Sequence, residues 1–319
     1  SIKTIDRPTR GTEICLSLKE DAKEYSETYR IRNLVTKYSD HVSIPVLLQS
    51  IVDSGDDDSG TNNEIKWDQV NQATALWTRS RNDITDAEYK EFYKHVAHDF
   101  EDPMTWSHHK VEGKIDYTGL LYVPRRAPYD LWNRESPRGL KLYVQRVFIM
   151  DRAEEFLPLY LRFIRGVIDS ADLSLNVSRE LLQKDTRVEA MKAAATRRAL
   201  DMLGKLAKDD PDEYQKFWGN FGECVKEGLA EDFQNKERIT KLLRFASTER
   251  NDGDQTIGID DYLERRIDDQ NDIYYLVSES HKNAVGSPYL EAFKQRGIEV
   301  LLLSDRIDEW LMTSIHEYK

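Results

Sequence analysis

The segment 53–63 constrains this chain more than any other, because it cannot join a folded core. It contains only Asp, Ser, Gly, Thr and Asn, with three consecutive aspartates at positions 56–58. Such a composition buries too little apolar surface to offset the entropy of ordering. We therefore predict a flexible charged linker over residues 53–66, with the aspartates as a solvated acidic run and not a metal site. The chain must then fold in at least two parts.

The part before the linker, residues 1–52, has a strand–helix–strand pattern. Residues 12–18 alternate polar and apolar side chains, which predicts a half-buried strand. Residues 25–38 have a mostly helical spacing of apolar side chains, and residues 43–48 form a short apolar run in which Pro45 indicates an edge strand. Three elements are too few to bury a core, so we expect this part to be the end of a larger domain.

A long region of mixed helix and strand patterns follows, over residues 67–185. Thr85 and Glu88 form a capping box that predicts the start of a helix with an apolar stripe as far as Phe100. The other predicted elements are strands at 115–123 and 140–149, a proline-punctuated loop with apolar side chains at 124–132, and an amphipathic helix at 156–168.

The rest of the chain changes from helices to a small α/β pattern. Residues 186–248 are helical in pattern, with turns at Asp210-Pro211 and at Gly228. In residues 249–319, two compact apolar strands at 273–277 and 300–303 are separated by a helix that ends at Gly297. This order is typical of a βαβ unit with a parallel strand pair.

Charge and cysteine usage exclude several classes of protein. The net charge of -12 and the pI of about 5.2 argue against a nucleic-acid partner. No apolar run approaches the roughly 20 residues of a membrane helix, so we expect no membrane partner. Cys15 and Cys224 lie far apart without metal-site spacing, which favours a reducing, cytoplasmic location. The N-terminus has no initiator Met and no apolar signal segment, so we expect either an internal fragment of a longer protein or an engineered chain.

The most informative stretch for chemistry is 172–183. Asn176 and Ser178 are good N-cap residues, so Arg179 is expected in the first helical turn, where backbone N–H groups favour anions. Gln183 lies four residues on and shares a face with Arg179. One interpretation is a phosphate-facing arginine, and the other is a surface arginine paired with Glu180 or Asp172. Spacing alone favours the second.

Other candidate sites have weaker patterns. His95, His98 and His108 could approach one another, but no carboxylate or cysteine completes a recognisable metal site, so we expect none. No Gly-rich nucleotide motif and no nucleophile or zinc-protease motif is present. In the last helix, Trp310 could either pack in the core or form an exposed binding surface.

Seven longer strings resemble the ninety-kilodalton heat-shock-protein chaperones, and the bacterial (HtpG-type) members most of all. They are far less degenerate than the short motifs above. They occupy residues 76–79, 88–93, 111–113, 126–131, 142–149, 175–180 and 301–310.

The resemblance implies a dimeric clamp in which the N-terminal domain binds ATP with Mg²⁺, the middle domain completes the ATPase, and the C-terminal domain dimerises. Asn176-Val177-Ser178-Arg179, together with Gln183, resembles the middle-domain catalytic loop, so Arg179 would reach the γ-phosphate, with Asn176, Ser178 and Gln183 beside it. This implication reverses the preference for a surface ion pair. Thr12 would join the network that binds adenine.

The family's remaining nucleotide-binding residues would lie before Ser1, so no cofactor is expected on this chain alone. The implied partners are unfolded or partly folded client proteins, co-chaperones, the protein's own N- and C-terminal domains, and a second copy of the full-length protein. A non-catalytic platform for clients and co-chaperones is the alternative. The residues expected to contact clients are Trp77, Tyr129, Trp132, Glu309 and Trp310.

The implied fold class is α/β, with a middle domain of two α/β/α subdomains. The large subdomain, of the ribosomal-S5-domain-2-like type, would span residues 67–185 and the small one 249–319. A helical connector over 186–248 would join them. Residues 1–52 would be the C-terminal remnant of the ATP-binding domain, a strand–helix–strand piece.

Overall fold

The computed structural model describes residues 10–52, 64–113, 115–133, 138–176, 179–250, 252–315 and 318. The chain divides into two compact units, an N-terminal unit that ends at Thr74 and a C-terminal unit that begins at Ala75. None of the helices among these residues is both long and apolar enough to cross a bilayer.

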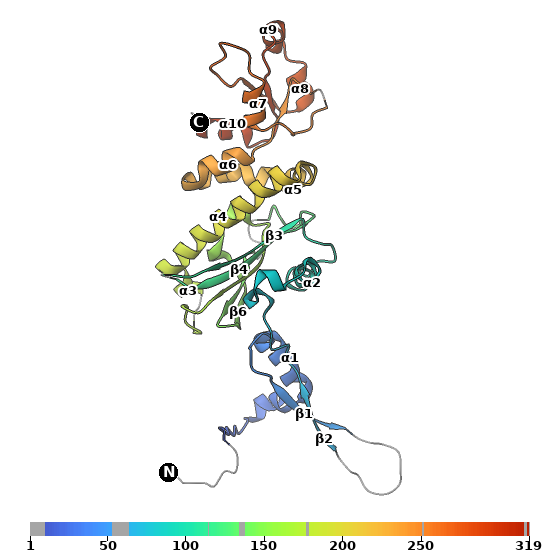
Figure 1. Cartoon of the computed structure of the whole chain (residues 1–319), viewed down its shortest axis with the longest axis vertical. Helices are drawn as coiled ribbons and strands as arrows, with labels where there is room; N and C mark the ends of the chain where they lie inside the picture. The colour runs from blue at the N-terminus through green and yellow to red at the C-terminus, as the bar shows by residue number, and fades with distance from the viewer. Residues whose placement is uncertain are drawn as a thin grey trace. The chain divides into compact units, whose positions relative to one another are not determined.

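The N-terminal unit contains one main helix and one hairpin (Figure 1). Its elements are η1 (Glu20–Ser26), α1 (Thr28–Ser39), β1 (Leu47–Val52) and β2 (Glu64–Gln69), with β1 and β2 antiparallel. The helix predicted at 25–38 is confirmed, and the second strand forms a few residues later than predicted. Residues 64–66 of the predicted linker belong to β2.

The strand predicted at residues 12–18 is wrong. This segment has no regular structure, and Ile14 and Leu16 are exposed. A strand needs a neighbour for its backbone hydrogen bonds, and these residues pair with no strand among those described. The alternation of polar and apolar side chains is therefore present in the sequence, but no described strand pairs with this segment.

The C-terminal unit is built on a mixed five-stranded sheet. The strands are β3 (Thr105–Val111), β4 (Tyr117–Val123), β5 (Leu140–Val144), β6 (Val147–Ala153) and β7 (Arg165–Ser170), in the order β3-β4-β7-β5-β6. Only the β5–β7 pair is parallel. Short 3-10 turns lie before and between these elements: η2 (Leu76–Thr78), η3 (Arg81–Asp83), η4 (Glu154–Phe156) and η5 (Leu159–Leu161).

Helices cover both faces of this sheet (Figure 1). Along β4, Leu120 and Tyr122 pack against α2 (Asp86–Ala97), while Leu121 and Val123 pack into the core formed by α4 (Thr186–Asp209). This alternation follows from the two-residue period of a strand. The predicted capping box is present, since Thr85 and Glu88 each accept a hydrogen bond from the other's backbone N–H.

Helices then lead to a small α/β subdomain. The helices are α3 (Arg179–Leu182), α4, α5 (Pro211–Glu231), η6 (Phe233–Asn235) and α6 (Lys236–Leu242). The turn predicted at Gly228 is wrong, because Gly228 lies inside α5, where it leaves room for the Tyr160 ring. The small subdomain contains β8 (Ala246–Ser247), α7 (Ile259–Glu264), β9 (Tyr275–Val277), α8 (His281–Val285), α9 (Leu290–Gln295), β10 (Leu301–Leu303) and α10 (Asp308–Ser314). Its strands β9 and β10 are parallel, as predicted. The expected α/β fold class is confirmed.

The helix predicted at residues 156–168 is wrong. Pro158 separates two short 3-10 turns, and the stretch then becomes the central strand β7. Gly166 permits this because a Cβ atom there would lie 2.0 Å from the backbone oxygen of Leu120 on β4. A fully buried apolar run shows neither the two-residue period of a strand nor the 3.6-residue period of a helix, so its pattern does not distinguish the two. Here the β-branched residues Val167 and Ile168 favour a strand.

The strand predicted at 140–149 is two strands joined by a tight turn. Gln145 and Arg146 both have positive φ angles, 52° and 68°. Two consecutive left-handed residues are the geometry of a two-residue hairpin, which usually contains Asn or Gly. The Asp169 carboxylate accepts a hydrogen bond from the Arg146 backbone N–H at 3.3 Å and supports the turn.

A buried ion cluster joins the helical connector to the small subdomain. The Lys226 ammonium on α5 donates to Asp305 at 2.7 Å and to Asp308 at 2.8 Å. The side chains of Lys226 and Asp308 are both 0% exposed. Burial raises the pKa of the Asp308 carboxyl above its ordinary value, although Lys226 opposes this shift. Neither charge can be solvated, so each depends on the other.

We expect Lys226→Met to destabilise the C-terminal unit by about 3–5 kcal/mol, because Asp308 would remain buried without a cation. Urea unfolding followed by circular dichroism would measure the change. Adding Asp308→Asn should restore a large part of the loss. A loss below about 1 kcal/mol in the single variant would show that the pair has little structural role.

His109 on β3 is a second buried ionisable group. It is 1% exposed, and its ring packs where Gly119 of β4 leaves room, since a Cβ atom there would lie 2.5 Å away. The ring meets Tyr117 edge-on at 5.7 Å. Burial, together with the charges of Arg198, Arg81 and His108, lowers the pKa of His109 to about 4.

This depressed pKa predicts a specific acid destabilisation. Below pH 6.5 the unfolded chain protonates His109, while the folded chain does not until about pH 4. Stability should therefore fall by roughly 3 kcal/mol as the pH drops through this window. His109→Phe, which keeps a buried ring, should remove this component from urea unfolding measured at each pH. Identical pH dependence in both proteins would contradict the assignment.

Candidate functional site

Two buried leucines, Leu173 and Leu182, lie at either end of the stretch that contains the predicted catalytic residues. Leu173 is 4% exposed and Leu182 is 1% exposed, and both belong to the main hydrophobic core. Between them Ser174, Leu175 and Asn176 are exposed, and α3 begins at Arg179. The two leucines hold the ends of this stretch in the core, and the described residues 174–176 between them are exposed.

Hydrogen bonds reinforce the base of this loop. The Asp172 carboxylate accepts from the backbone N–H of Asp116 at 2.6 Å, and the Asp172 carbonyl accepts from Arg187 at 2.5 Å. Asp185 caps the start of α4 through the Arg187 N–H at 2.9 Å and forms an ion pair with the Arg187 side chain at 2.6 Å. Hydrogen bonding to Arg187 lowers the pKa of Asp185, which favours its charged form. These hydrogen bonds and the ion pair hold the two ends of the loop in fixed positions.

Of the four predicted catalytic residues, the structure describes the side chains of Asn176 and Gln183. Asn176 is exposed, and its backbone N–H donates to the Ser174 hydroxyl at 3.3 Å. Gln183 is exposed in the turn after α3. Ser178 and the Arg179 side chain lie outside the described residues, so the two interpretations of Arg179 stay open on geometry.

The carboxylates suggested as alternative partners of Arg179 have partners of their own. Asp172 accepts from Asp116, as described above, and Glu180 forms an ion pair with Lys184 at 3.6 Å on an exposed helical turn. Thr12, expected to bind nucleotide, is exposed in the irregular part of the N-terminal unit. Its role stays a prediction.

Trp77 does not lie on a client-contacting surface. It is 1% exposed, and its indole N–H donates to the Asp169 carboxylate at 2.8 Å. Its ring packs on Tyr143 at 4.7 Å and on Phe92 at 5.7 Å. The expectation that Trp77 contacts clients is therefore corrected: its surface and its N–H are both used inside the core.

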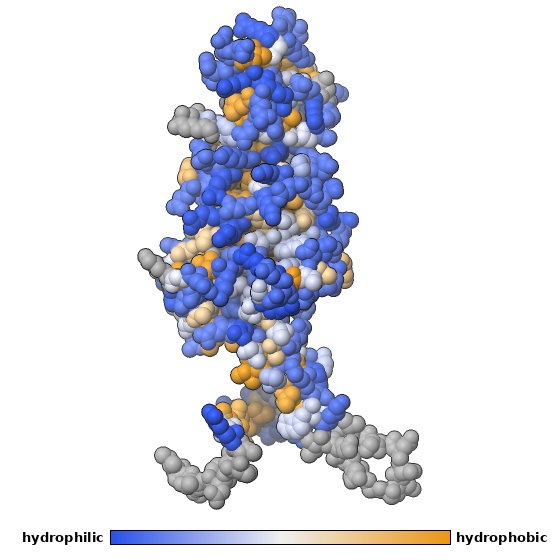
Figure 2. All heavy atoms as spheres, in the orientation of Figure 1, coloured by the Kyte–Doolittle hydropathy of each residue, from blue (hydrophilic) through white to orange (hydrophobic). Residues whose placement is uncertain are grey.

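The other four residues expected to meet clients are accessible. Tyr129 is 100% exposed, Trp132 is 53% exposed and Trp310 is 74% exposed, while Glu309 is also exposed. The visible surface of the C-terminal unit is largely hydrophilic (Figure 2), although other large apolar side chains, such as Phe100 and Tyr289, are exposed as well. The Arg162 guanidinium lies 5.4 Å from the Trp132 ring centroid. This cation–π contact orients a large exposed aromatic side chain.

Glu309 and Trp310 line an open groove of about 1180 Å³ between α5 and the small subdomain. Sequence reasoning missed the opposite wall, which consists of Glu223 and Glu227 on α5. Their i, i+4 spacing places them on one helix face and was the available signal. The remaining lining residues are Val277, Ser278, Glu279, Asn283, Ser304, Asp305, Arg306 and Ile307.

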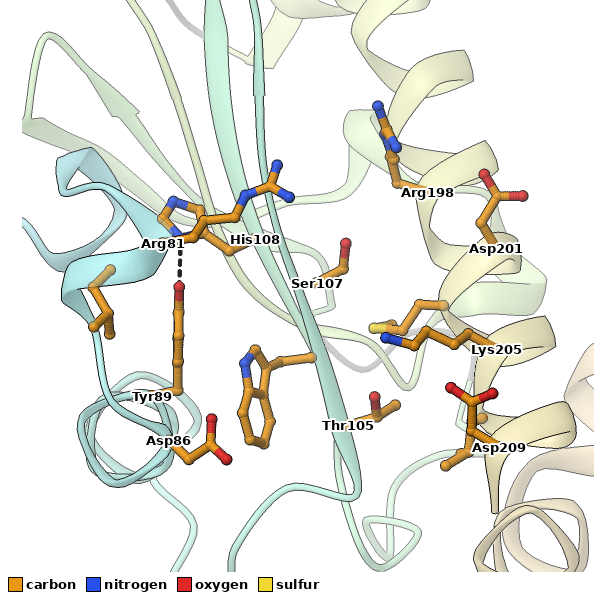
Figure 3. Close-up of a pocket in the computed structure, with 14 residues that line it drawn as sticks. Arg81, Asp86, Tyr89, Thr105, Ser107, His108, Arg198, Asp201, Lys205 and Asp209 are labelled. Atoms are coloured by element: carbon orange, nitrogen blue, oxygen red, sulfur yellow. Dashed lines mark hydrogen bonds between the residues drawn. The ribbon is translucent and has the colours of Figure 1, made fainter. Parts of the chain in front are cut away.

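A second cavity of about 520 Å³ lies beside strand β3 (Figure 3). Its charged side chains nearly balance, so it favours no charged ligand: they are Arg81, Arg198, Lys205, Asp86, Asp201 and Asp209. The dashed line in Figure 3 marks the 2.8 Å hydrogen bond between Tyr89 and His108. The other ring nitrogen of His108 bonds the Trp77 carbonyl at 2.8 Å.

These contacts bear on the metal interpretation of the histidines. Both nitrogens of His108 already have protein partners. Across the part of the chain that the structure describes, no three His, Cys, Asp or Glu side chains are grouped so that they could hold a metal ion. The geometry therefore gives His95 and His98 no third ligand.

Comparison with known proteins covers both the loop and the groove. A family model described as Hsp90 protein matches residues 52–319. Among solved structures, one described as the middle domain of a Plasmodium falciparum heat shock protein is similar to this chain, with a TM-score of 0.69 and 33% sequence identity. The alignment covers 77% of this chain and 96% of that chain.

Proposed function

Because the chain belongs to the Hsp90 family, we propose that it is the middle region of an ATP-dependent chaperone whose loop at 174–183 acts on ATP held by the N-terminal domain. Family membership and the similar middle-domain structure make it a chaperone middle region. The catalytic role of the loop is the proposal. In it, Arg179 places a guanidinium at the terminal phosphate, and Asn176, Ser178 and Gln183 orient the loop.

The observation that carries this proposal is the position of Arg179. It begins α3, three residues before the buried anchor Leu182. A charged residue presented from a rigid frame loses little entropy when it meets its target. An arginine supplied by a neighbouring domain can stabilise the charge that develops during phosphoryl transfer.

Neither cavity described above suits ATP. The larger groove is lined by Glu223, Glu227, Glu279 and Glu309, which would repel a triphosphate. The smaller cavity has nearly balanced charges and is open. We propose that ATP and Mg²⁺ bind elsewhere in the full-length protein, where Thr12 would contribute, and that this chain alone hydrolyses ATP negligibly.

In the full-length protein, Arg179→Ala should lower the steady-state ATPase rate at least about tenfold. Arginines that stabilise the transition state of phosphoryl transfer raise kcat by about 10³-fold to 10⁵-fold in other enzymes. ATP affinity should change much less, because the arginine acts mainly on the transition state. A coupled phosphate-release assay with nucleotide titration separates the two quantities.

Lys184→Ala is the matched control. Lys184 is a cation five residues along the same loop, 77% exposed and paired only with Glu180 among the described residues. Its removal should change the rate less than about twofold. An unchanged rate in Arg179→Ala would disprove the catalytic assignment without affecting the fold assignment.

A binding platform for clients and co-chaperones is the second candidate function. The exposed aromatic side chains Tyr129, Trp132 and Trp310 favour it, because such residues dominate protein interfaces. On this view the partners are unfolded or partly folded proteins in the cytoplasm, and the full-length protein is a homodimer. Assignment to the bacterial type also stays part of this proposal.

Trp310→Ala should weaken binding of an unfolded client to this chain by at least about tenfold, the usual scale of an aromatic hot spot. Fluorescence anisotropy of a labelled, permanently unfolded protein would measure the affinity. Tyr289→Ala is the control, because Tyr289 is equally exposed at 75% but does not line the groove. Equal effects of both variants would remove Trp310 from the client surface.

A further inference from the structure

The groove between α5 and the small subdomain is strongly acidic. Five carboxylates line it, from Glu223, Glu227, Glu279, Asp305 and Glu309. Among the described lining residues, Arg306 is the one side chain with a permanent positive charge. Negative charge is therefore concentrated in this groove, beyond the excess of acidic residues in the chain as a whole.

The two inner carboxylates of the groove, Glu227 and Asp305, are already paired with cations that belong to the protein. Glu227 accepts two hydrogen bonds from the Arg162 guanidinium, at 2.6 Å and 3.0 Å. Asp305 accepts from Lys226 at 2.7 Å and from the Gln255 amide at 3.1 Å. These two side chains are committed to holding the walls together, so they are poor ligands for anything new.

The outer carboxylates of Glu223, Glu279 and Glu309 differ. All three are exposed, and within the described ranges none of them has an ion pair or a side-chain hydrogen bond. Burial raises the pKa of the Glu223 carboxyl, and the negative charge of Asp305 raises it further. This unfavourable crowding is relieved when a cation enters the groove.

The groove also offers an apolar surface. Trp310 is 74% exposed at its rim, and Val277 and Ile307 are half-buried in its lining. The volume of about 1180 Å³ exceeds that of most small-molecule sites, which span about 300–1,000 Å³. An extended polypeptide segment would fill such an open space better than a small molecule.

We propose that this groove selects client segments in which Lys or Arg residues flank an apolar side chain. The apolar side chain packs on Trp310, and the flanking cations meet Glu223, Glu279 and Glu309. An arginine can also stack on the Trp310 ring. This selection rests on the client-binding function proposed above and adds a chemical class of ligand to it.

Two labelled, unstructured peptides test the proposal directly against this chain. In one, two Arg residues flank a Leu-Leu pair on each side, and in the other Glu replaces every Arg. The Arg peptide should bind at least tenfold more tightly in fluorescence anisotropy. Its affinity should fall as salt rises from 50 to 300 mM, because exposed charges are screened over the Debye length. Equal affinity of the two peptides would overturn the proposal.

Charge variants locate the effect. Glu223→Gln/Glu279→Gln/Glu309→Gln should weaken binding of the Arg peptide at least tenfold. The control Glu189→Gln/Glu264→Gln/Glu291→Gln removes the same net charge from exposed helical positions outside the groove and should change affinity less than twofold. Equal losses in both variants would show attraction by the overall negative charge and overturn the proposal.

Trp310→Ala separates failure of this proposal from failure of client binding. If Trp310→Ala weakens binding of an unfolded client while the groove charges have no effect, the client site stands and the charge selection fails. If neither change has an effect, clients do not bind in this groove at all. Circular dichroism of each variant would establish that its fold is retained.

Discussion

The buried ammonium of Lys226 is the contact on which the architecture of the C-terminal unit depends most. It lies on α5, with Asp305 and Asp308 of the small subdomain as its partners, and an unpaired charge in this position would be very costly. The cluster therefore fixes where the small subdomain packs on the connector. Because Asp305 also lines the acidic groove, the same contact sets the groove's shape. Stability and the candidate binding surface are thus coupled at one helix.

A second set of contacts extends this coupling into the large subdomain. Arg162 follows η5, donates to the Leu131 carbonyl at 2.9 Å, and pairs with Glu227 on α5. The same guanidinium lies against Trp132. The helix α5 is thus linked to the loop at 124–132 through Arg162 and to the small subdomain through Lys226. Trp132 and the subdomain that carries Trp310 are therefore connected through the same helix.

Sequence patterns within a short segment correctly predicted the elements that depend mainly on that segment. The capping box at Thr85, the Asp210-Pro211 helix junction and the parallel strands β9 and β10 all formed as expected. The failures needed information from other segments. Residues 12–18 lacked a neighbouring strand, and residues 156–168 became β7 because Gly166 allows close approach to β4. Likewise, burial of Trp77 depends on Asp169, which is distant in sequence. The loop at 174–183 was identified by resemblance, since spacing alone favoured a surface ion pair.

The anchoring of α3 limits how far Arg179 can travel. Arg179 and Leu182 are the ends of one helical turn, and a helix rises only about 1.5 Å per residue, so their Cα atoms stay about 5 Å apart while α3 is folded. Leu182 is held in the core. The backbone of Arg179 therefore stays close to the core, and the distance that its guanidinium can reach is set mainly by the length of the side chain. Under the catalytic role proposed above, the domain that holds the nucleotide would have to bring the phosphate to Arg179 by rigid-body motion, and the rate of that motion would set an upper limit on turnover.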